Sequence, residues 1–151
     1  MSKLMFGDLL KIDEGIILHQ VNELGTMKAG LGKLLNTKYT GLEIFTQKFI
    51  YTYSNCLGKF YPFEVGKLTI CNCFTEKGLC SDRKPNDPPN TQYNAVIECF
   101  NNIYKAYNYE ANHDMVFLPF KYGCGLAGGN WNIVQEILKD YPFIILKTIL
   151  S

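Results

Sequence analysis

The residue types that could do chemistry gather in glycine-rich segments, and the most informative of these segments is Phe117–Trp131, FLPFKYGCGLAGGNW. An apolar run here leads into a turn that contains four glycines, after which Asn130 can cap a helix beginning at Trp131. Glycine allows positive backbone angles and close approach of a ligand, so successive main-chain N–H groups can point at one anion. The free N–H groups of the helix start extend the same positive potential. The segment therefore predicts a phosphate-binding loop.

A second segment with the same order lies near the N-terminus. Residues 15–21, GIILHQV, are typical of a buried strand, and the glycine-rich stretch NELGTMKAGLGKLL follows them. Loops at the carboxyl ends of strands in one α/β sheet face each other across a crevice, which is where such sheets bind ligands. A diphosphate is the ligand that we expect between two such loops.

Strands and helices are expected to alternate along the chain. Apolar patterning predicts strands at 3–6, 15–21, 67–74, 115–120 and 143–149, and helices at 29–38, 41–53, 92–108 and 131–140. A turn is expected around Tyr61 and Pro62, a polar loop over 76–90, and a cap at Asn90 or Thr91 for the helix that follows. Strands separated by helices predict an α/β protein with helices on both faces of a sheet.

Length and charge limit the possible functions. A chain of 151 residues is expected to form one domain, residues 1–151. The 15 Lys and Arg residues nearly balance 14 Asp and Glu residues, so no strong field draws the protein to nucleic acid or to a membrane surface. The N-terminus lacks the pattern of a signal peptide, and no apolar run reaches the ~18 residues of a membrane span. We therefore expect a cytoplasmic protein.

The six cysteines are expected to be reduced thiols, because no secretory signal accompanies them. Cys71 and Cys73 share one face of a predicted strand, but no CxxC or histidine partner completes a metal site, so we predict no metal. Cys124 in the second loop could be a nucleophile, although packing of a small side chain beneath the loop is favoured.

Four segments together resemble the macro domain, a module that binds ADP-ribose. They are GDLL (7–10), HQVN (19–22), GTMKAGLGKLL (25–35) and PFKYGCGLAGGNW (119–131), and their order and spacing are those of the family. The resemblance implies a three-layer α/β/α fold with a mixed central sheet. The chain is similar to small bacterial and phage macro proteins, and also to the branch that contains ADP-ribose 1''-phosphate phosphatases and the terminal ADP-ribose protein-glutamate hydrolase.

The resemblance also implies roles for individual residues. Asp8 matches the acidic residue that binds the adenine amino group, and we expect Leu9 beside it to belong to the ligand-binding set. Asn22 matches the asparagine that holds the hydroxyls of the distal ribose. On a purely structural interpretation, Asp8 is a turn residue and Asn22 forms an Asx-turn. The two loops imply further ligand contacts by Gly25, Met27, Lys28, Ala29, Gly30, Gly32, Tyr122, Gly123, Cys124, Gly125, Leu126, Ala127 and Gly128.

Catalysis would differ from that of the glutamate hydrolase, whose lysine and aspartate positions correspond here to Glu76 and Ala127. A water-based reaction would instead need one side chain to handle a proton. His19 and Asn22 are the two predicted catalytic residues. His19 is the candidate for the proton, because imidazole can titrate near neutral pH. A buried histidine hydrogen-bonded to backbone is the structural alternative. Asp82 and Asp87 could close over the distal ribose, whereas a structural or exposed role is expected for His113.

These observations favour an enzyme that hydrolyses an ester on the distal ribose of ADP-ribose, foremost ADP-ribose 1''-phosphate. Deacetylation of O-acetyl-ADP-ribose and removal of ADP-ribose from macromolecules are related candidates. The alternatives are a non-catalytic ADP-ribose reader and a binder of another NAD-derived nucleotide signal. ADP-ribose or a derivative is the expected partner, together with ADP-ribosylated macromolecules, and no cofactor is expected.

Overall fold

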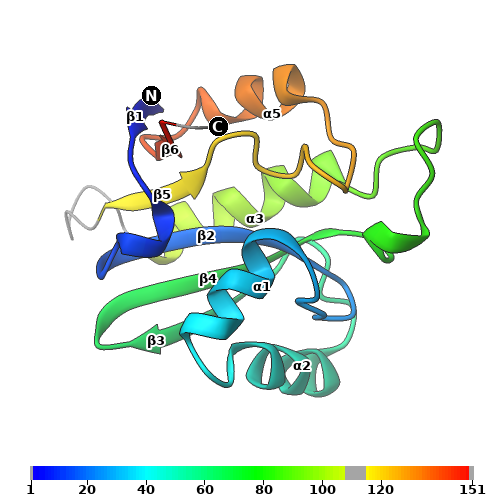
Figure 1. Ribbon diagram of the computed structural model, residues 1–151, viewed down its shortest axis with the longest axis horizontal. Helices are drawn as coiled ribbons and strands as arrows, with labels where there is room; N and C mark the ends of the chain where they lie inside the picture. Colours follow the sequence, from blue (N-terminus) through cyan, green and yellow to red (C-terminus); the bar gives the residue numbers. More distant parts are fainter. Residues whose placement is uncertain (1, 108–114, 150–151) are drawn as a thin grey trace.

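A mixed sheet of six strands runs through the centre of the computed structural model, which describes residues 2–107 and 115–149 (Figure 1). The strand order is β1-β6-β5-β2-β4-β3, and all neighbours are parallel except β3 and β4. The bounds are β1 Lys3–Phe6, β2 Glu14–Asn22, β3 Phe60–Val65, β4 Lys67–Glu76, β5 Val116–Pro119 and β6 Ile144–Lys147.

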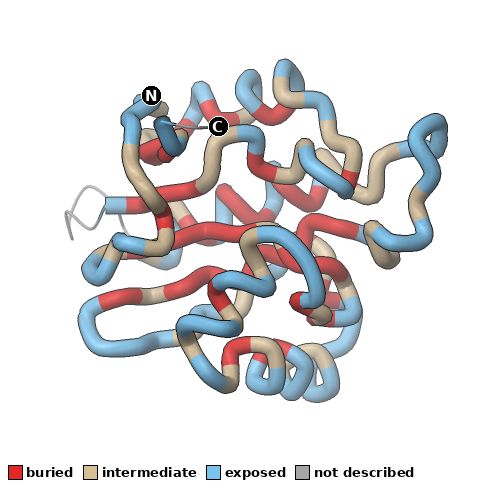
Figure 2. Tube along the Cα trace, in the orientation of Figure 1, coloured by how far each residue is buried: buried red, intermediate tan, exposed pale blue. Residues whose placement is uncertain are grey.

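Helices cover both faces of this sheet. Helices α1 (Gly30–Lys38) and α2 (Leu42–Tyr53) lie on one face, and α3 (Tyr93–Ala106) and α5 (Trp131–Leu138) lie on the other. Because side chains alternate along a strand, Ile17 of β2 packs in the core beneath α1 and α2, while Ile16 packs in the core beneath α3 and α5. Figure 2 shows the resulting line of buried residues along the central strands. The predicted three-layer α/β/α fold is confirmed.

Strand β3 was not predicted, and the turn expected around Tyr61 and Pro62 is wrong. Both residues lie inside β3 and pair with Asn72 and Cys71 of β4. Proline lacks an N–H donor, which favours turns, but an edge strand tolerates it because one side of the strand has no partner. The turn of this hairpin lies instead at Gly66, whose φ of 58° favours glycine.

One of the two predicted helix caps is confirmed. The Asn130 side chain accepts a hydrogen bond from the N–H of Asn132 at 2.9 Å and caps α5. The cap expected from Asn90 or Thr91 is wrong, because α3 begins after Gln92 and has no side-chain cap. The hydroxyl of Thr91 is used elsewhere, since it donates to the Gly123 carbonyl at 2.6 Å.

The remaining segments are short. Two 3-10 helices, Leu9–Lys11 and Cys80–Asp82, interrupt the loops after β1 and β4. Residue 108, expected at the end of a helix, lies outside the described residues, as do His113 and Asp114. In the two described ranges, none of the helices combines the length and the apolar character needed to span a bilayer.

The topology creates a site at one edge of the sheet. Strands β2 and β5 are parallel neighbours, but β2 leads to α1 on one face and β5 leads to α5 on the other. Where two adjacent strands diverge in this way, the loops after them leave a crevice at their carboxyl ends. The two predicted phosphate loops are these connections.

Candidate functional site

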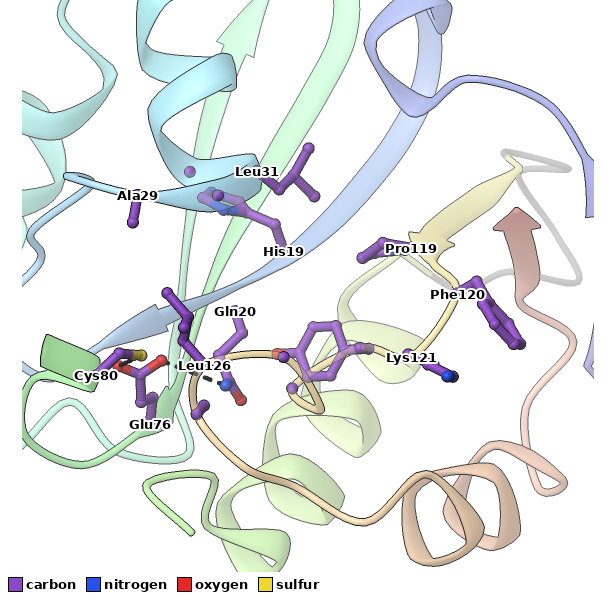
Figure 3. A pocket seen from close by; sticks show the side chains of 16 residues that line it. His19, Gln20, Ala29, Leu31, Glu76, Cys80, Pro119, Phe120, Lys121 and Leu126 are labelled. Atoms are coloured by element: carbon purple, nitrogen blue, oxygen red, sulfur yellow. Dashed lines mark hydrogen bonds between the residues drawn. The ribbon is translucent and has the colours of Figure 1, made fainter. Parts of the chain in front are cut away.

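Two adjoining cavities, of about 300 and about 400 Å³, lie at the carboxyl ends of β2, β4 and β5. Residues from the first glycine loop form one wall, and residues from the second form the opposite wall of the smaller cavity (Figure 3). The two cavities share six lining residues, so they form one crevice: Gln20, Ala29, Gly32, Glu76, Cys80 and Leu126.

Most of the predicted site residues line this crevice. They are His19, Asn22, Met27, Lys28, Ala29, Gly30, Gly32, Tyr122, Gly123, Gly125, Leu126 and Ala127. The structure places the other five outside the lining: Asp8, Leu9, Gly25, Cys124 and Gly128. The two glycine-rich segments of the sequence do lie on opposite walls of the crevice. Two of their glycines, Gly25 and Gly128, pack within the protein and do not line the crevice.

Asn22 organises the first loop from the end of β2. Its side-chain oxygen accepts from the N–H groups of Leu24 and Thr26 at 3.0 and 3.2 Å, and its side-chain nitrogen donates to the Thr26 hydroxyl at 2.7 Å. This is the Asx-turn of the structural interpretation, and Asn22 lines the crevice as well. Gly25 in the same turn packs against α2, where a Cβ atom would lie 2.7 Å from Ile50 Cδ1.

The second loop folds through successive turns. The N–H groups of Cys124, Gly128 and Gly129 donate to the carbonyls of Lys121, Gly125 and Gly123 at 2.9–3.0 Å. Gly128 has a φ of 74°, and a Cβ atom there would collide with the guanidinium of Arg83. Arg83 is in turn held by the carbonyls of Asp87 and Pro88, so the loop after β4 packs against the second glycine loop at this glycine.

Main-chain N–H groups without a protein acceptor gather on both walls. Within the part of the chain that the structure describes, residues 29–32 at the start of α1 and residues 125–127 of the second loop donate no hydrogen bond from their amides. All seven residues line the crevice. Two opposed groups of free donors are an arrangement that suits an anionic ligand.

A directional chain of hydrogen bonds fixes the second loop from below. The Thr75 hydroxyl donates to Gln20 Oε1 at 2.8 Å, so the Tyr122 hydroxyl, 2.7 Å away, must be the donor to Thr75. Gln20 Nε2 donates to the Thr91 hydroxyl at 3.0 Å, and Thr91 donates to the Gly123 carbonyl. The network ties β2 and β4 to the turn that carries the free amides.

His19 lies on the crevice wall but is almost completely buried, with 1% of its surface exposed. Asn72 uses its side-chain nitrogen to donate to the carbonyls of Tyr61 and Ile70, so its oxygen faces His19 Nε2 at 2.6 Å. Nε2 therefore carries the ring proton, and Nδ1 is an acceptor that has no partner among the described residues. Burial lowers the pKa of His19 to about 4, and this effect outweighs the hydrogen bond with Asn72, which raises the pKa.

This geometry corrects the premise on which His19 was predicted to handle a proton. The imidazole does not titrate near neutral pH, because its charged form would be desolvated. Its partner is the side chain of Asn72 and not the backbone, as the structural alternative supposed.

Several other predicted residues have structural roles. Asp8 caps the 3-10 helix by accepting from the Leu10 N–H at 2.9 Å, and Leu9 packs in the core beneath α1 and α2. The Cys124 thiol donates to the Tyr122 carbonyl at 3.2 Å, and burial raises its pKa to about 11, which favours packing over nucleophilic attack. Asp82 and Asp87 do not line the crevice.

Sequence reasoning missed ten lining residues, which lie at the ends of β2, β4 and β5, in the loops that follow these strands, and on α1. They are Gln20, Thr26, Leu31, Glu76, Leu79, Cys80, Ser81, Pro119, Phe120 and Lys121. Glu76 was noted only as a departure from the glutamate hydrolase. A signal was nevertheless available, because Glu76 is a polar residue two positions after the predicted strand 67–74, and ligand-binding side chains concentrate at the carboxyl ends of such strands.

No family model matches the sequence, and no curated protein sequence matches it significantly. Solved structures do match. A Bacteroides thetaiotaomicron protein of unknown function has a TM-score of 0.81 at 24% identity, covering 99% of this chain and 98% of that one. The macrodomain of Mycobacterium tuberculosis DarG has a TM-score of 0.76 at 20% identity, covering 97% of each chain.

Thermosipho africanus DarTG, whose structure is a complex with ADP-ribose, has a TM-score of 0.75 at 17% identity. The match covers 99% of this chain and 42% of that larger one. At these identities the likeness concerns the fold, and it extends over nearly the whole of this chain in all three comparisons. The chain therefore has the macrodomain fold.

Proposed function

We propose that the crevice binds ADP-ribose or a derivative of it, with the diphosphate between the two glycine loops. The observation that carries this proposal is the pair of opposed amide groups at residues 29–32 and 125–127. The cavities have the size of small-molecule sites, which is about 300–1,000 Å³. The ADP-ribose complex of Thermosipho africanus DarTG, which shares the fold, supports the ligand class.

We further propose hydrolysis of an ester on the distal ribose, as in an ADP-ribose 1''-phosphate phosphatase. The larger cavity brings the polar side chains of Asn22, Thr26 and Glu76 next to the phosphate loops. Those loops would hold the substrate while a side chain manages the proton of an attacking water. O-acetyl-ADP-ribose and ADP-ribosylated macromolecules are substrates of the same chemical class. A single domain over 1–151 and a cytoplasmic location stay predictions of the sequence.

The test is incubation of the protein with ADP-ribose 1''-phosphate and, separately, with O-acetyl-ADP-ribose. We expect release of phosphate, followed by phosphorus NMR, or loss of the acetyl group, followed by mass spectrometry. A protein that binds ADP-ribose and releases neither group would be a reader of ADP-ribose and not a hydrolase.

A further inference from the structure

Glu76 occupies the part of the crevice that both cavities share. It ends the central strand β4, only 6% of its surface is exposed, and it lines the smaller and the larger cavity. Figure 3 shows Glu76 with Gln20 and Cys80 at one end of the pocket, while Phe120 and Lys121 lie at the other end. A buried carboxyl group therefore faces the space where a ligand would lie.

Two neighbours hold the carboxyl group without neutralising it. The Cys80 thiol donates to Oε2 at 3.1 Å, and Gln20 Nε2 donates to Oε1 at 3.4 Å. Each carboxylate oxygen can accept two hydrogen bonds, so each keeps a free acceptor position. In residues 2–107 and 115–149, the only ion pairs are Lys28 with Glu43 and Lys139 with Glu136, so no cation is paired with Glu76.

The surroundings favour uptake of a proton by this group. Burial raises the pKa of Glu76, and the hydrogen bonds from Cys80 and Gln20 oppose that shift only partly. The other titratable groups that line the same cavities are His19 on β2, Lys28 on the first loop, Cys80 after β4, and Lys121 and Tyr122 on the second loop. A carboxylate whose pKa moves toward neutral pH is a better general base than an exposed one.

His19 is poorly suited to this role. Its Nε2–H is committed to Asn72, and its Nδ1 is a fixed acceptor on an imidazole whose pKa is about 4. Such a group can accept a hydrogen bond from a ligand hydroxyl or amino group, but it holds a transferred proton poorly at neutral pH. Glu76, in contrast, is a carboxylate on the crevice wall, and both of its oxygens keep unused lone pairs.

We propose that Glu76 is the general base of this crevice, an inference that rests on the proposed hydrolysis of a distal-ribose ester. A Glu76 carboxylate oxygen takes a proton from water as the water oxygen bonds to the acyl carbon or phosphorus of the ester. The bond from that atom to the ribose oxygen then breaks. The departing ribose oxygen takes the proton back from Glu76, which leaves a free ribose hydroxyl, an acid, and the carboxylate restored.

The test compares Glu76→Gln with the wild type and with Glu136→Gln, the same chemical change on the exposed surface of α5. Turnover of O-acetyl-ADP-ribose and ADP-ribose 1''-phosphate is measured from pH 4 to 9, and ADP-ribose binding is measured by calorimetry. We expect Glu76→Gln to lower kcat/KM at pH 7 by about 10²-fold or more. ADP-ribose affinity should be equal or tighter, because a negative charge near the diphosphate is removed.

The pH profile separates a base from a residue that only supports the fold. The wild type should lose activity as pH falls through the raised pKa of Glu76, since the ionised form is the active one, and Glu76→Gln should lack this limb. If Glu76→Gln does not fold, Glu76→Asp carries the test, with turnover slowed about tenfold or more because its carboxyl group lies one methylene further back.

The outcomes distinguish the two proposals. If the wild type hydrolyses either ester and Glu76→Gln retains its rate within about threefold, Glu76 is not the base while the proposed function stands. If the wild type binds ADP-ribose and hydrolyses neither ester, the hydrolase and its base are both overturned. If ADP-ribose does not bind, the proposed function itself is wrong.

Discussion

His19 is held in one tautomer by an asparagine that is 53 residues away in the sequence. The HQVN segment correctly indicated a histidine at the crevice, because it ends a central strand. Its protonation state could not be predicted, since that state depends on burial and on the orientation of Asn72, which Tyr61 and Ile70 fix. The place of Glu76 could not be predicted either. Both cavities meet at its side chain, which depends on how the loops after β2, β4 and β5 pack together.

Nitrogen NMR of the imidazole ring tests this description of His19. We expect a neutral ring with the proton on Nε2 from pH 8 down to about 5, and protonation only near pH 4. Because the folded pKa lies below the unfolded value of 6.5, the stability gained from the neutral ring should be lost as pH falls from 6.5 toward 4. A His113→Gln variant assigns the signal. A midpoint between pH 6 and 7 would contradict the account.

Elements with strong hydrophobic periodicity were predictable, and one element with a proline was not. The pattern of α3 follows Val96, Phe100 and Ile103, all of which are buried against the sheet. Strand β3 carries Pro62 and lies at the sheet edge, where pairing with β4 decides the structure against the local turn preference. The central strands could therefore be predicted from local sequence patterns. The edge strand β3 could not, because it depends on pairing with β4.

Thr91, in the connection before α3, joins β2 to the second glycine loop through its hydroxyl. Thr91→Val keeps the shape of the side chain but removes the hydroxyl that joins Gln20 to the Gly123 carbonyl. We expect a loss of about 1–3 kcal/mol in unfolding free energy, because buried polar partners are left unpaired. ADP-ribose affinity should fall about tenfold, as the amides of the second loop lose their support.

Chemical denaturation and calorimetry measure the two effects of Thr91→Val. Thr52→Val is the matched control, because the Thr52 hydroxyl bonds only to its own helix, at an exposed position of α2. The control should stay within about 0.5 kcal/mol of the wild type. Equal affinity for ADP-ribose in Thr91→Val and the wild type would show that the network does not position the loop.

At the scale of the whole molecule, the crevice exists because β2 and β5 are neighbours whose following helices cover opposite faces of the sheet. The alternation of strands and helices predicted this arrangement, and the two glycine loops predicted where it would bind a ligand. The third contributor, the segment Leu79–Ser81 after β4, was expected only as a polar loop. Its contact with the crevice depends on packing such as that of Arg83 on Gly128, which no local pattern reveals.

The most direct measurement of the central claim is a calorimetric titration of the protein with ADP-ribose, beside NAD and cyclic ADP-ribose. We expect one ADP-ribose per chain, with a dissociation constant near 1 μM or below. This value corresponds to a binding free energy of about −8 kcal/mol. Gly125→Phe should abolish binding at an unchanged melting temperature, because Gly125 lines the crevice and a Cβ atom there meets nothing. No heat with ADP-ribose, or preference for a cyclic nucleotide, would contradict the account.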